Sequence, residues 1–303
     1  MSTRLQWLDN AKGITIILMV LGHTSIPQSV SNFIWTFHMP LFFIASGWTT
    51  NWEKYSVCDF FAKKAKTLLL PFVVYSTMVL LLYENLIVDG KVKHWLLNGW
   101  EGYALWFIPV LFFALILGRI VYITPNKYFR YAMMTVLLLL GCLLSYQHLH
   151  LPWTLSSVPF ASFLVLLGTE LKRLQKWIDE PRWWILTGGF TLALGISHFW
   201  RLDMCFNSIL PIIPLTVGAV AGTMMMFTLS SYIAKYTKLC SYALQTVGRE
   251  TYVVVAFSQI IIILLNNYFI LNTVVKYVTL VVLLVTIAII KNAFNKLIGE
   301  KIL

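Results

Sequence analysis

Charge is scarce in this sequence. Only 12% of its 303 residues are Asp, Glu, Lys or Arg, whereas soluble domains carry about a quarter. No polar stretch is long enough to fold as a separate soluble domain, and we find no low-complexity linker and no clear internal repeat. The composition therefore argues against an ordinary soluble protein and favours a single domain over 1–303.

Cysteine is also rare, and no CxxC spacing occurs. The four cysteines are Cys58, Cys142, Cys205 and Cys240. They fall in different loops and apolar runs, so the sequence predicts neither a disulfide framework nor a cysteine metal site. His148 and His150 form the motif "HLHLPW", but two ligands are too few for a metal site. We therefore expect no bound metal.

Apolar residues dominate what remains. They make up 59% of the chain, and its mean hydropathy is +0.77. Runs of about 17–25 apolar residues recur from end to end, which is the length of a membrane-spanning helix. The sequence predicts an all-α fold, a polytopic membrane helix bundle of about ten transmembrane helices. The expected helices cover 8–27, 33–50, 67–88, 104–123, 131–147, 156–171, 183–199, 209–232, 251–270 and 275–290.

The formal net charge is +11, but its distribution does not indicate a nucleic-acid partner. The basic residues form short clusters between apolar runs, as in membrane proteins. Nineteen of the 23 fall on one side of the expected topology, and the other side holds Lys91, Lys93, Arg201 and Lys276. This asymmetry predicts that both termini are cytoplasmic. All six histidines then fall in the outer half of the bundle or in outer loops.

The first apolar run, "LDNAKGITIILMVLGHTS", contains two ionisable residues, Lys12 and His23. Such residues inside a membrane are candidates for function, because burying them is costly unless they are paired or hydrated. Eleven positions of helix separate them by about 16 Å. The alternative is that Lys12 extends to the inner headgroups while His23 marks the outer interface. Asp9 lies three residues before Lys12, a spacing that favours an ion pair.

Three further segments carry polar groups at the ends of apolar runs. "FHMPLFFIASGW" contains His38, which we expect to face His23 at the outer side. "DFFAKKAKTLLLPF" holds a basic cluster of Lys63, Lys64 and Lys66 before an apolar run. "YALWFIPVLFF" places Trp106 at the outer start of a helix, close to Glu101. Each of these residues also has a simpler interpretation as an interface or packing residue.

Taken in order, these motifs resemble the acyltransferase 3 family of membrane proteins, which transfer acyl groups, usually acetyl, to cell-envelope sugars. The resemblance is strongest over 4–72 and weaker to about residue 113. The family pattern of Arg or Lys, ten residues and His matches Lys12 and His23. The family segment "FHMPLFF..SG" matches 37–47 almost letter for letter.

Two segments depart from the family pattern. The family motif R-x-x-R is matched by Lys63 and Lys66, and lysine lacks the bidentate fork of arginine. The late segment "VGRETYVVVAFSQ" resembles a family segment in which many members carry a histidine ten residues after the glycine. Ser258 stands at that position here, which puts a catalytic role for this helix in doubt.

The resemblance implies a multi-pass protein of the bacterial cytoplasmic (inner) membrane, with acetyl-CoA or another acyl-CoA as donor. Lys63, Lys64 and Lys66 are then expected to bind the phosphates of the donor. His23 is expected to be the catalytic base or a transient acyl carrier, because the pKa of histidine suits proton transfer near neutral pH. His38 is expected to orient His23 or to contact the thioester, and Lys12 to meet the polar arm of the donor or to fix its helix.

The implied acceptor is a hydroxyl of an envelope saccharide or glycolipid, with Glu101 and Trp106 as expected sugar contacts. The remaining expected partner is the lipid bilayer, and the sequence does not specify the oligomeric state. A transporter or flippase for a small solute or a lipid-linked sugar is the main alternative function. Release of free CoA would distinguish the two classes, and a structural scaffold is the third option.

Overall fold

The computed structural model describes residues 5–84, 99, 104–268 and 272–298. It is built from helices, and within these ranges it contains no strand beyond one isolated bridge between Asp203 and Ser208. The all-α prediction is confirmed. The elements of the first half are α1 Gln6–Gly22, α2 Gln28–Thr49, α3 Val57–Lys64, the π-helix η1 Ala65–Leu69, α4 Leu70–Glu84, the 3₁₀ turn η2 Ala104–Trp106, α6 Phe107–Ile123 and α7 Lys127–Tyr146.

The second half continues the pattern of helices joined by short turns. Its elements are η3 Pro152–Ser157, α8 Val158–Leu171, η4 Lys172–Leu174, α9 Gln175–Asp179, α10 Trp183–Phe199, α11 Ile212–Tyr236, α12 Lys238–Arg249, α13 Thr251–Tyr268 and α14 Thr273–Ile298. Each of the ten ranges expected from the sequence overlaps one long helix. Three α-helices, α3, α9 and α12, fall in stretches that the sequence analysis left between spans.

Not all of these helices have the length and composition of a membrane span. Within the described ranges, five segments are long and apolar enough to cross a membrane: Ala104–Ile123, Lys127–Tyr146, Pro152–Asp179, Ile212–Tyr236 and Val274–Ala293. A sixth is possible if Lys238–Arg249 and Thr251–Asn266, which meet at 82°, form one broken span. A helix of 17 residues such as α1 is about 25 Å long, slightly less than the hydrocarbon core. The protein is therefore a multi-pass membrane protein, while about ten spans and cytoplasmic termini stay predictions.

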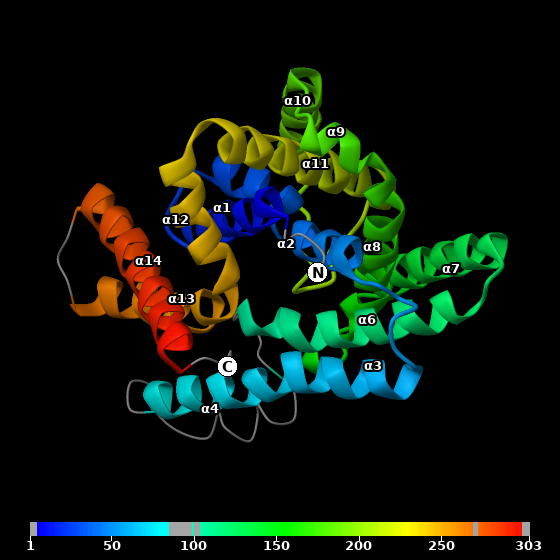
Figure 1. Cartoon of the computed structure of the whole chain (residues 1–303), viewed down its shortest axis with the longest axis horizontal. Helices are drawn as coiled ribbons and strands as arrows, with labels where there is room; N and C mark the ends of the chain where they lie inside the picture. Colours follow the sequence, from blue (N-terminus) through cyan, green and yellow to red (C-terminus); the bar gives the residue numbers. More distant parts are fainter. Residues whose placement is uncertain (1–4, 85–98, 100–103, 269–271, 299–303) are drawn as a thin grey trace.

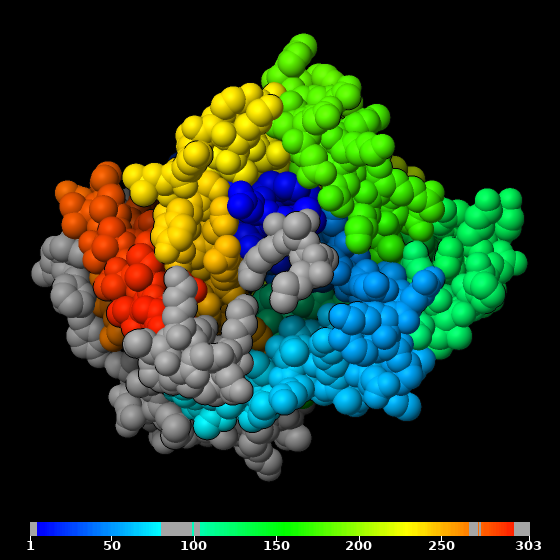
Figure 2. All heavy atoms as spheres, in the orientation of Figure 1, coloured from blue at the N-terminus to red at the C-terminus, as the bar shows by residue number. Residues whose placement is uncertain are grey.

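Helix α1 lies at the centre of the bundle, with α2, α11 and α12 around it (Figure 1). Figure 2 shows α1 recessed in the middle of this face, next to α12. The contact between α1 and α12 is made by backbone. A Cβ atom on Gly13 would lie 2.2 Å from the carbonyl oxygen of Leu244, and one on Gly248 would lie 1.9 Å from that of Asp9. These glycines let the two helices approach closely, as small residues do in membrane bundles.

A second backbone contact joins α2 to α8. A Cβ atom on Gly47 would lie 1.7 Å from the carbonyl oxygen of Val165, and one on Gly168 would lie 2.1 Å from that of Ile44. The hydroxyl of Thr169 donates a hydrogen bond of 3.2 Å to the carbonyl of Gly47. Helices α1, α2, α8, α11 and α12 therefore form a closely packed centre that holds the site residues in place.

The helices at the edge of the bundle are apolar on their outer faces. Only 17% of α7 and of the apolar window of α14 is buried. Side chains such as Leu139, Leu143 and Val282 are more than half exposed. Apolar helices with this exposure suit contact with lipid, since lipid tails do not penalise exposed hydrocarbon.

The segment α3–η1–α4 runs along one side of the bundle (Figure 1). Its π-helical turn precedes Pro71, whose ring cannot donate a backbone hydrogen bond to the preceding turn. The hydroxyl of Tyr252 in α13 donates a hydrogen bond of 2.8 Å to the carbonyl of Leu68 inside this turn. The π-helix therefore lies where the basic cluster meets the apolar helix, a place where such turns often accompany function.

Candidate functional site

A cavity of about 210 Å³ opens beside the end of α1. We call it the histidine chamber, because His23 and His38 both line it. The remaining wall comes from α1, α2, η2 and the loop after α10, through Met19, Trp35, Met39, Ala104, Trp106, Arg201, Asp203, Met204, Cys205 and Phe206. The structure thus brings together three residues that the sequence singled out, namely the two histidines and Trp106.

Trp35 is the central ring of the histidine chamber. Its ring centroid is 5.0 Å from that of His23 and 4.7 Å from that of His38. The guanidinium of Arg201 also packs on the Trp35 ring, at 4.3 Å from its centroid. This is a cation–π geometry. Trp35 can approach α1 because position 22 is glycine, where a Cβ atom would lie 2.4 Å from the indole. Trp35 therefore fixes the spacing between the two imidazoles.

His38 is held in one tautomer by its own helix. Its Nδ1 lies 3.0 Å from the carbonyl oxygen of Ile34, and a carbonyl can only accept a hydrogen bond. Nδ1 must therefore carry the proton, which leaves the lone pair of the neutral ring on Nε2. His38 is 4% exposed and lies ten residues into α2, so it is deeper in the bundle than the sequence analysis expected.

His23 is the C-cap residue of α1 and is half-buried. Among the described residues, no hydrogen bond from a side chain fixes its ring. Asp203 and Arg201 are close enough to act electrostatically on it. Asp203 is itself fixed, because its carboxylate accepts a hydrogen bond of 3.1 Å from the backbone N–H of Cys205. His23 thus combines access to the chamber with a charged pair at its side.

The loop of 200–211 covers the histidine chamber and is braced at several points. Two hydrogen bonds of 3.0 and 2.8 Å join the backbones of Asp203 and Ser208. The hydroxyl of Ser157 donates to the carbonyl of Met204, and the N–H of Ile209 donates to the hydroxyl of Ser145 at 3.3 Å. The loop is therefore tied to α7 and η3 and presents Arg201 and Asp203 to the histidines.

A second cavity, of about 420 Å³, lies between α2, α3 and α6. We call it the lysine chamber, because Lys54, Lys63 and Lys64 line it together with the hydroxyl-bearing residues Ser46, Thr49, Thr50 and Tyr55. Within the described part of the chain, no carboxylate forms an ion pair with any of these three lysines. Uncompensated positive charge in a cleft attracts anions.

Tyr55 connects the lysines of this chamber. The ammonium of Lys63 donates a hydrogen bond to the Tyr55 hydroxyl at 2.5 Å, and this bond lowers the pKa of Tyr55. The guanidinium of Arg119 donates a hydrogen bond of 3.1 Å to the Tyr55 carbonyl. Burial lowers the pKa of Lys64, and the nearby ammonium groups of Lys63 and Lys12 lower it further. The lysine chamber therefore concentrates positive charge.

The remaining residues that the sequence analysis singled out differ in their distance from the lysine chamber. Lys12 acts electrostatically on Lys64, so the lysine of α1 belongs to the surroundings of the lysine chamber, although it is not part of the wall. Lys66 is exposed and is not among the residues that line the chamber. Glu101 lies outside the described residues. Lys54 and Tyr55 were not among the residues that the sequence analysis singled out.

The two chambers share α2 as a wall, and η2 of the histidine chamber leads directly into α6, which lines the lysine chamber. Along α2, Met39 of the histidine chamber and Ser46 of the lysine chamber are seven residues, or about 10 Å, apart. Phe42 lies between these positions, and its ring centroid is 6.0 Å from that of Phe107 in α6. Both rings are buried. A pair of buried aromatic rings therefore lies at the level of α2 that is between the two chambers.

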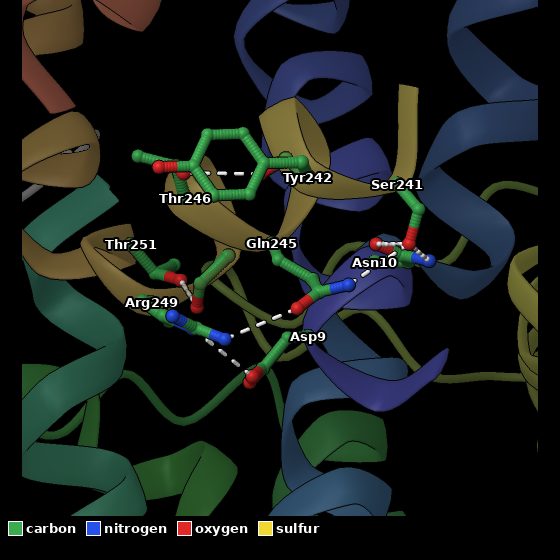
Figure 3. Close-up of polar contacts among 9 residues, drawn as sticks. Asp9, Asn10, Ser241, Tyr242, Gln245, Thr246, Arg249 and Thr251 are labelled. Carbon is green, nitrogen blue, oxygen red and sulfur yellow. Dashed lines mark hydrogen bonds and ion pairs between the residues drawn. The ribbon is translucent and has the colours of Figure 1, made fainter. Parts of the chain in front are cut away.

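A polar network joins α1 to α12 beside the two glycines (Figure 3). The carboxylate of Asp9 lies 3.5 Å from Nε of Arg249, a distance at which the contact is electrostatic and not a well-formed hydrogen bond. Arg249 donates a hydrogen bond of 3.1 Å to Gln245, and Asn10 donates one of 2.9 Å to Ser241. The pairing of Asp9 with Lys12 stays a prediction, and the structure gives Asp9 a contact with Arg249.

Arg201, Asp203 and Arg249 were not predicted as site residues. One signal for Arg201 was present, since it is one of only four basic residues expected on the outer side. Asp203 and Arg249 gave a weaker signal, because the partners that reveal them come from distant parts of the chain. Ser258, which replaces the histidine of many family members, is 1% exposed and donates a hydrogen bond of 3.1 Å to the carbonyl of Val255.

Comparison with known proteins identifies the family of this chain. The family model described as an acyltransferase domain, that of the acyltransferase 3 family, matches residues 5–293. No curated protein and no solved structure gives a significant match. The match includes both chambers and every helix that forms them. The chain therefore belongs to the acyltransferase 3 family and is a membrane acyltransferase.

Proposed function

We propose that this protein transfers an acetyl group, or another short acyl group, from cytoplasmic acyl-CoA to a hydroxyl of an envelope or lipid-linked saccharide. The observation that carries the proposal is the pair of chambers along α2, one with two imidazoles and one with three lysines. An acyl transfer of this kind needs a proton acceptor for the hydroxyl and a site for a polyanionic donor. The bacterial inner membrane is the proposed location, with polysaccharide modification as the role.

The donor is proposed to bind with its phosphates in the lysine chamber. Lys63 and Lys64 supply ammonium groups, and Lys54 adds a third on the same wall. Each can form charge-assisted hydrogen bonds to phosphate oxygens. The pantetheine arm would then follow α2 and α6 past Phe42 and Phe107, over the distance of about 10 Å that separates the chambers. This places the thioester in the histidine chamber.

His23 is the proposed base. Its half-buried ring can reach an acceptor hydroxyl, and the carboxylate of Asp203 stabilises the imidazolium that forms. In the direct route, His23 takes the proton from the hydroxyl, and the hydroxyl oxygen attacks the thioester carbonyl carbon. A C–O bond forms, the C–S bond breaks, and the CoA thiolate takes the proton back from His23. The two products are an ester and free CoA.

The second route passes through the imidazole itself. A nitrogen of His23 attacks the thioester, CoA leaves, and the acceptor hydroxyl then displaces the imidazole from the acyl group. His38 is the proposed second base in this route, because its Nδ1 proton is held by Ile34 and its Nε2 carries the lone pair. Arg201 can stabilise the negative oxygen that develops in either route. Trp106 is proposed to contact the sugar ring, and Glu101 is proposed as a further contact.

The test is a reconstitution. The full chain in lipid nanodiscs is incubated with acetyl-CoA labelled in the acetyl group and with envelope saccharides from the organism that makes the protein. Free CoA is measured with a thiol reagent, and the saccharides are analysed by mass spectrometry. We expect CoA release that depends on saccharide, together with a mass gain of one acetyl group per modified sugar.

The same experiment tests the alternative of a transporter or flippase. Such a protein would bind the saccharide without releasing CoA and without changing the mass of the sugar. CoA release in the presence of saccharide but with unmodified sugars would also contradict the proposal. His23→Ala, prepared in the same way, is the matched inactive variant.

A further inference from the structure

A third cavity, of about 380 Å³, adjoins the histidine chamber. We call it the Asn207 pocket. It lies between the loop after α7, which contributes His150, Thr154 and Ser156, and the loop after α10, which contributes Asn207. Cys205 and Phe206 line both this pocket and the histidine chamber. A ligand that fills one cavity can therefore continue into the other.

Asn207 carries an unusual side chain for a buried position. It is 3% exposed, and neither its amide oxygen nor its amide nitrogen has a hydrogen-bond partner. Buried polar groups are nearly always hydrogen-bonded, because leaving them unpaired is costly. The side chain nevertheless lines a cavity. An amide in this position has two donor hydrogens and an acceptor oxygen that no other described residue engages.

The backbone around the pocket is strained. Among the described residues other than glycine, those with positive φ are His148, Trp153, Thr154 and Asn207. All four belong to the two loops that form the pocket. Thr154, at φ 57°, is β-branched, and such a residue rarely adopts this conformation. Strain of this kind persists where the surrounding structure holds it, and it is frequent at ligand sites.

Hydrogen bonds hold both loops in this arrangement. The N–H of Leu151 donates a bond of 2.7 Å to the hydroxyl of Ser156, and the two backbone bonds between Asp203 and Ser208 close the other loop. The pocket is therefore built before a ligand arrives.

The chemistry of the lining points to a neutral, hydroxyl-rich ligand. The described residues that line the pocket include no Asp, Glu, Lys or Arg, so it is unsuited to a phosphate or a carboxylate. It offers an amide, an imidazole and a hydroxyl next to the ring of Phe206. Few and fixed polar groups on an apolar wall are typical of small-molecule sites. Saccharides combine hydroxyl groups with apolar ring faces and fit this lining.

We propose that the Asn207 pocket is a second saccharide subsite, which binds the sugar residue next to the one acylated in the histidine chamber. This proposal rests on the proposed function. In this proposal, Asn207 and Thr154 determine whether the enzyme prefers a single sugar or a chain of sugars as its acceptor. A longer acceptor gains hydrogen bonds in the pocket that a monosaccharide cannot make.

The test compares acceptors of different length. Envelope saccharides from the producing organism are separated into monosaccharide and trisaccharide fractions, and the KM of each is measured with acetyl-CoA and the full chain in nanodiscs. The variant Asn207→Gly removes the amide but tolerates the positive φ. Ser208→Gly is the matched control, because Ser208 is the next residue of the same loop, is exposed and lines neither cavity.

In the wild type we expect a lower KM for the trisaccharide than for the monosaccharide. Asn207→Gly should raise the trisaccharide KM about tenfold or more, which is the range for loss of a buried hydrogen bond. The monosaccharide KM and the slow hydrolysis of acetyl-CoA without acceptor should not change. If Asn207→Gly does not fold, the same KM measurements are made with Thr154→Gly. This variant relieves backbone strain while it removes a hydroxyl from the pocket.

Three results would overturn the subsite. Equal KM values of the wild type for the two fractions would exclude a second subsite. A ratio of KM values unchanged in the folded variants, or changed equally by Ser208→Gly, would exclude a role for Asn207 and Thr154. If the wild type acylates no saccharide at all, the proposed function fails and the subsite fails with it, whereas the first two results leave the proposed function intact.

Discussion

The histidine chamber and the lysine chamber share helix α2 but are lined by different kinds of side chain. The first is small and lined by imidazole and indole rings, with one arginine and one aspartate. The second has about twice the volume and is lined by three ammonium groups and several hydroxyls. Proton transfer requires groups that change charge near neutral pH, whereas recognition of a polyanion requires fixed charge. In the proposed function, this difference separates the reaction from donor binding.

The comparison also depends on orientation. Cys58 is exposed in α3 beside the lysine chamber, and Cys205 lines the histidine chamber. In intact cells, an impermeant maleimide should label a variant that keeps only Cys205 and leave one that keeps only Cys58 unlabelled. Cys58 should react once the membrane is permeabilised. Labelling of Cys58 from outside would reverse the assignment of the two chambers to the two sides.

The strongest functional effect is expected at the histidine chamber. His23→Ala should lower acyl transfer by about 10²- to 10⁴-fold, the usual contribution of a general base. Donor binding should remain, because the lysines are untouched. Rates from CoA release and affinity from titration with acetyl-CoA give the two values. His198→Ala, at an exposed histidine that does not line the chamber, is the control, and similar losses in both variants would argue against a role for His23.

The opposite pattern is expected at the lysine chamber. The double change Lys63→Ala and Lys64→Ala should weaken acetyl-CoA binding by about 10- to 100-fold, since each loses a charge-assisted hydrogen bond. The rate at saturating donor should change little. Lys66→Ala is the matched comparison, because Lys66 does not line the chamber, and its effect should be smaller. Equal donor affinity in the wild type and the double variant would reject the proposed donor site.

A smaller effect is expected from removing the positive charge of Arg201, which lines the histidine chamber. Arg201→Gln removes the guanidinium that lies on Trp35 and should reduce kcat/KM for the saccharide by about 2- to 30-fold, the range for a cation–π contact of about 0.5–2 kcal/mol. Lys276→Gln changes another outer basic residue that does not line the chamber. A loss of the same size with Lys276→Gln would show a general effect of surface charge.

The smallest effect is expected at the boundary between the chambers. Phe42→Ala removes the ring that contacts Phe107. We expect acetyl-CoA hydrolysis without acceptor to rise about threefold, because a closed site protects reactive groups from water. Phe42→Leu keeps most of the volume and should hydrolyse acetyl-CoA at the wild-type rate. Thermal unfolding must be measured for both variants, since truncating a buried Phe costs about 3–5 kcal/mol. Unchanged hydrolysis in a folded Phe42→Ala protein would contradict a role for this ring as a partition.

Much of the fold and part of the site could be predicted from the sequence. The apolar runs located ten helices because their length and hydropathy are local properties. His23 and His38 could be placed together because a short turn joins their helices. Helix α12 was missed, since it is polar and amphipathic and its partner, α1, is more than 200 residues earlier. The backbone contact of Gly13 with Gly248 likewise depends on two segments that no local pattern connects.

The site residues divide in the same way. Lys63 and Lys64 formed a visible cluster, whereas Lys54 belongs to the same chamber through the folding of the loop after α2. Arg201 was visible as a rare outer charge, but its place on Trp35 required the fold. Asn207 gave no signal in the sequence, because an unpaired buried amide can be recognised only when its surroundings are known.

The contact between α1 and α12 has a consequence for biosynthesis. Asp9 and Arg249 are 240 positions apart, and at 5–20 residues per second their partners emerge about 10–50 s apart. During that interval α1, with Asp9, Asn10 and Lys12, has no α12 against which to pack. We therefore expect the polar start of α1 to stay near water, an insertase or a chaperone until synthesis is nearly complete. Assembly of the site is thus a late event, and a chain that stops before 238 would leave α1 without its place in the membrane.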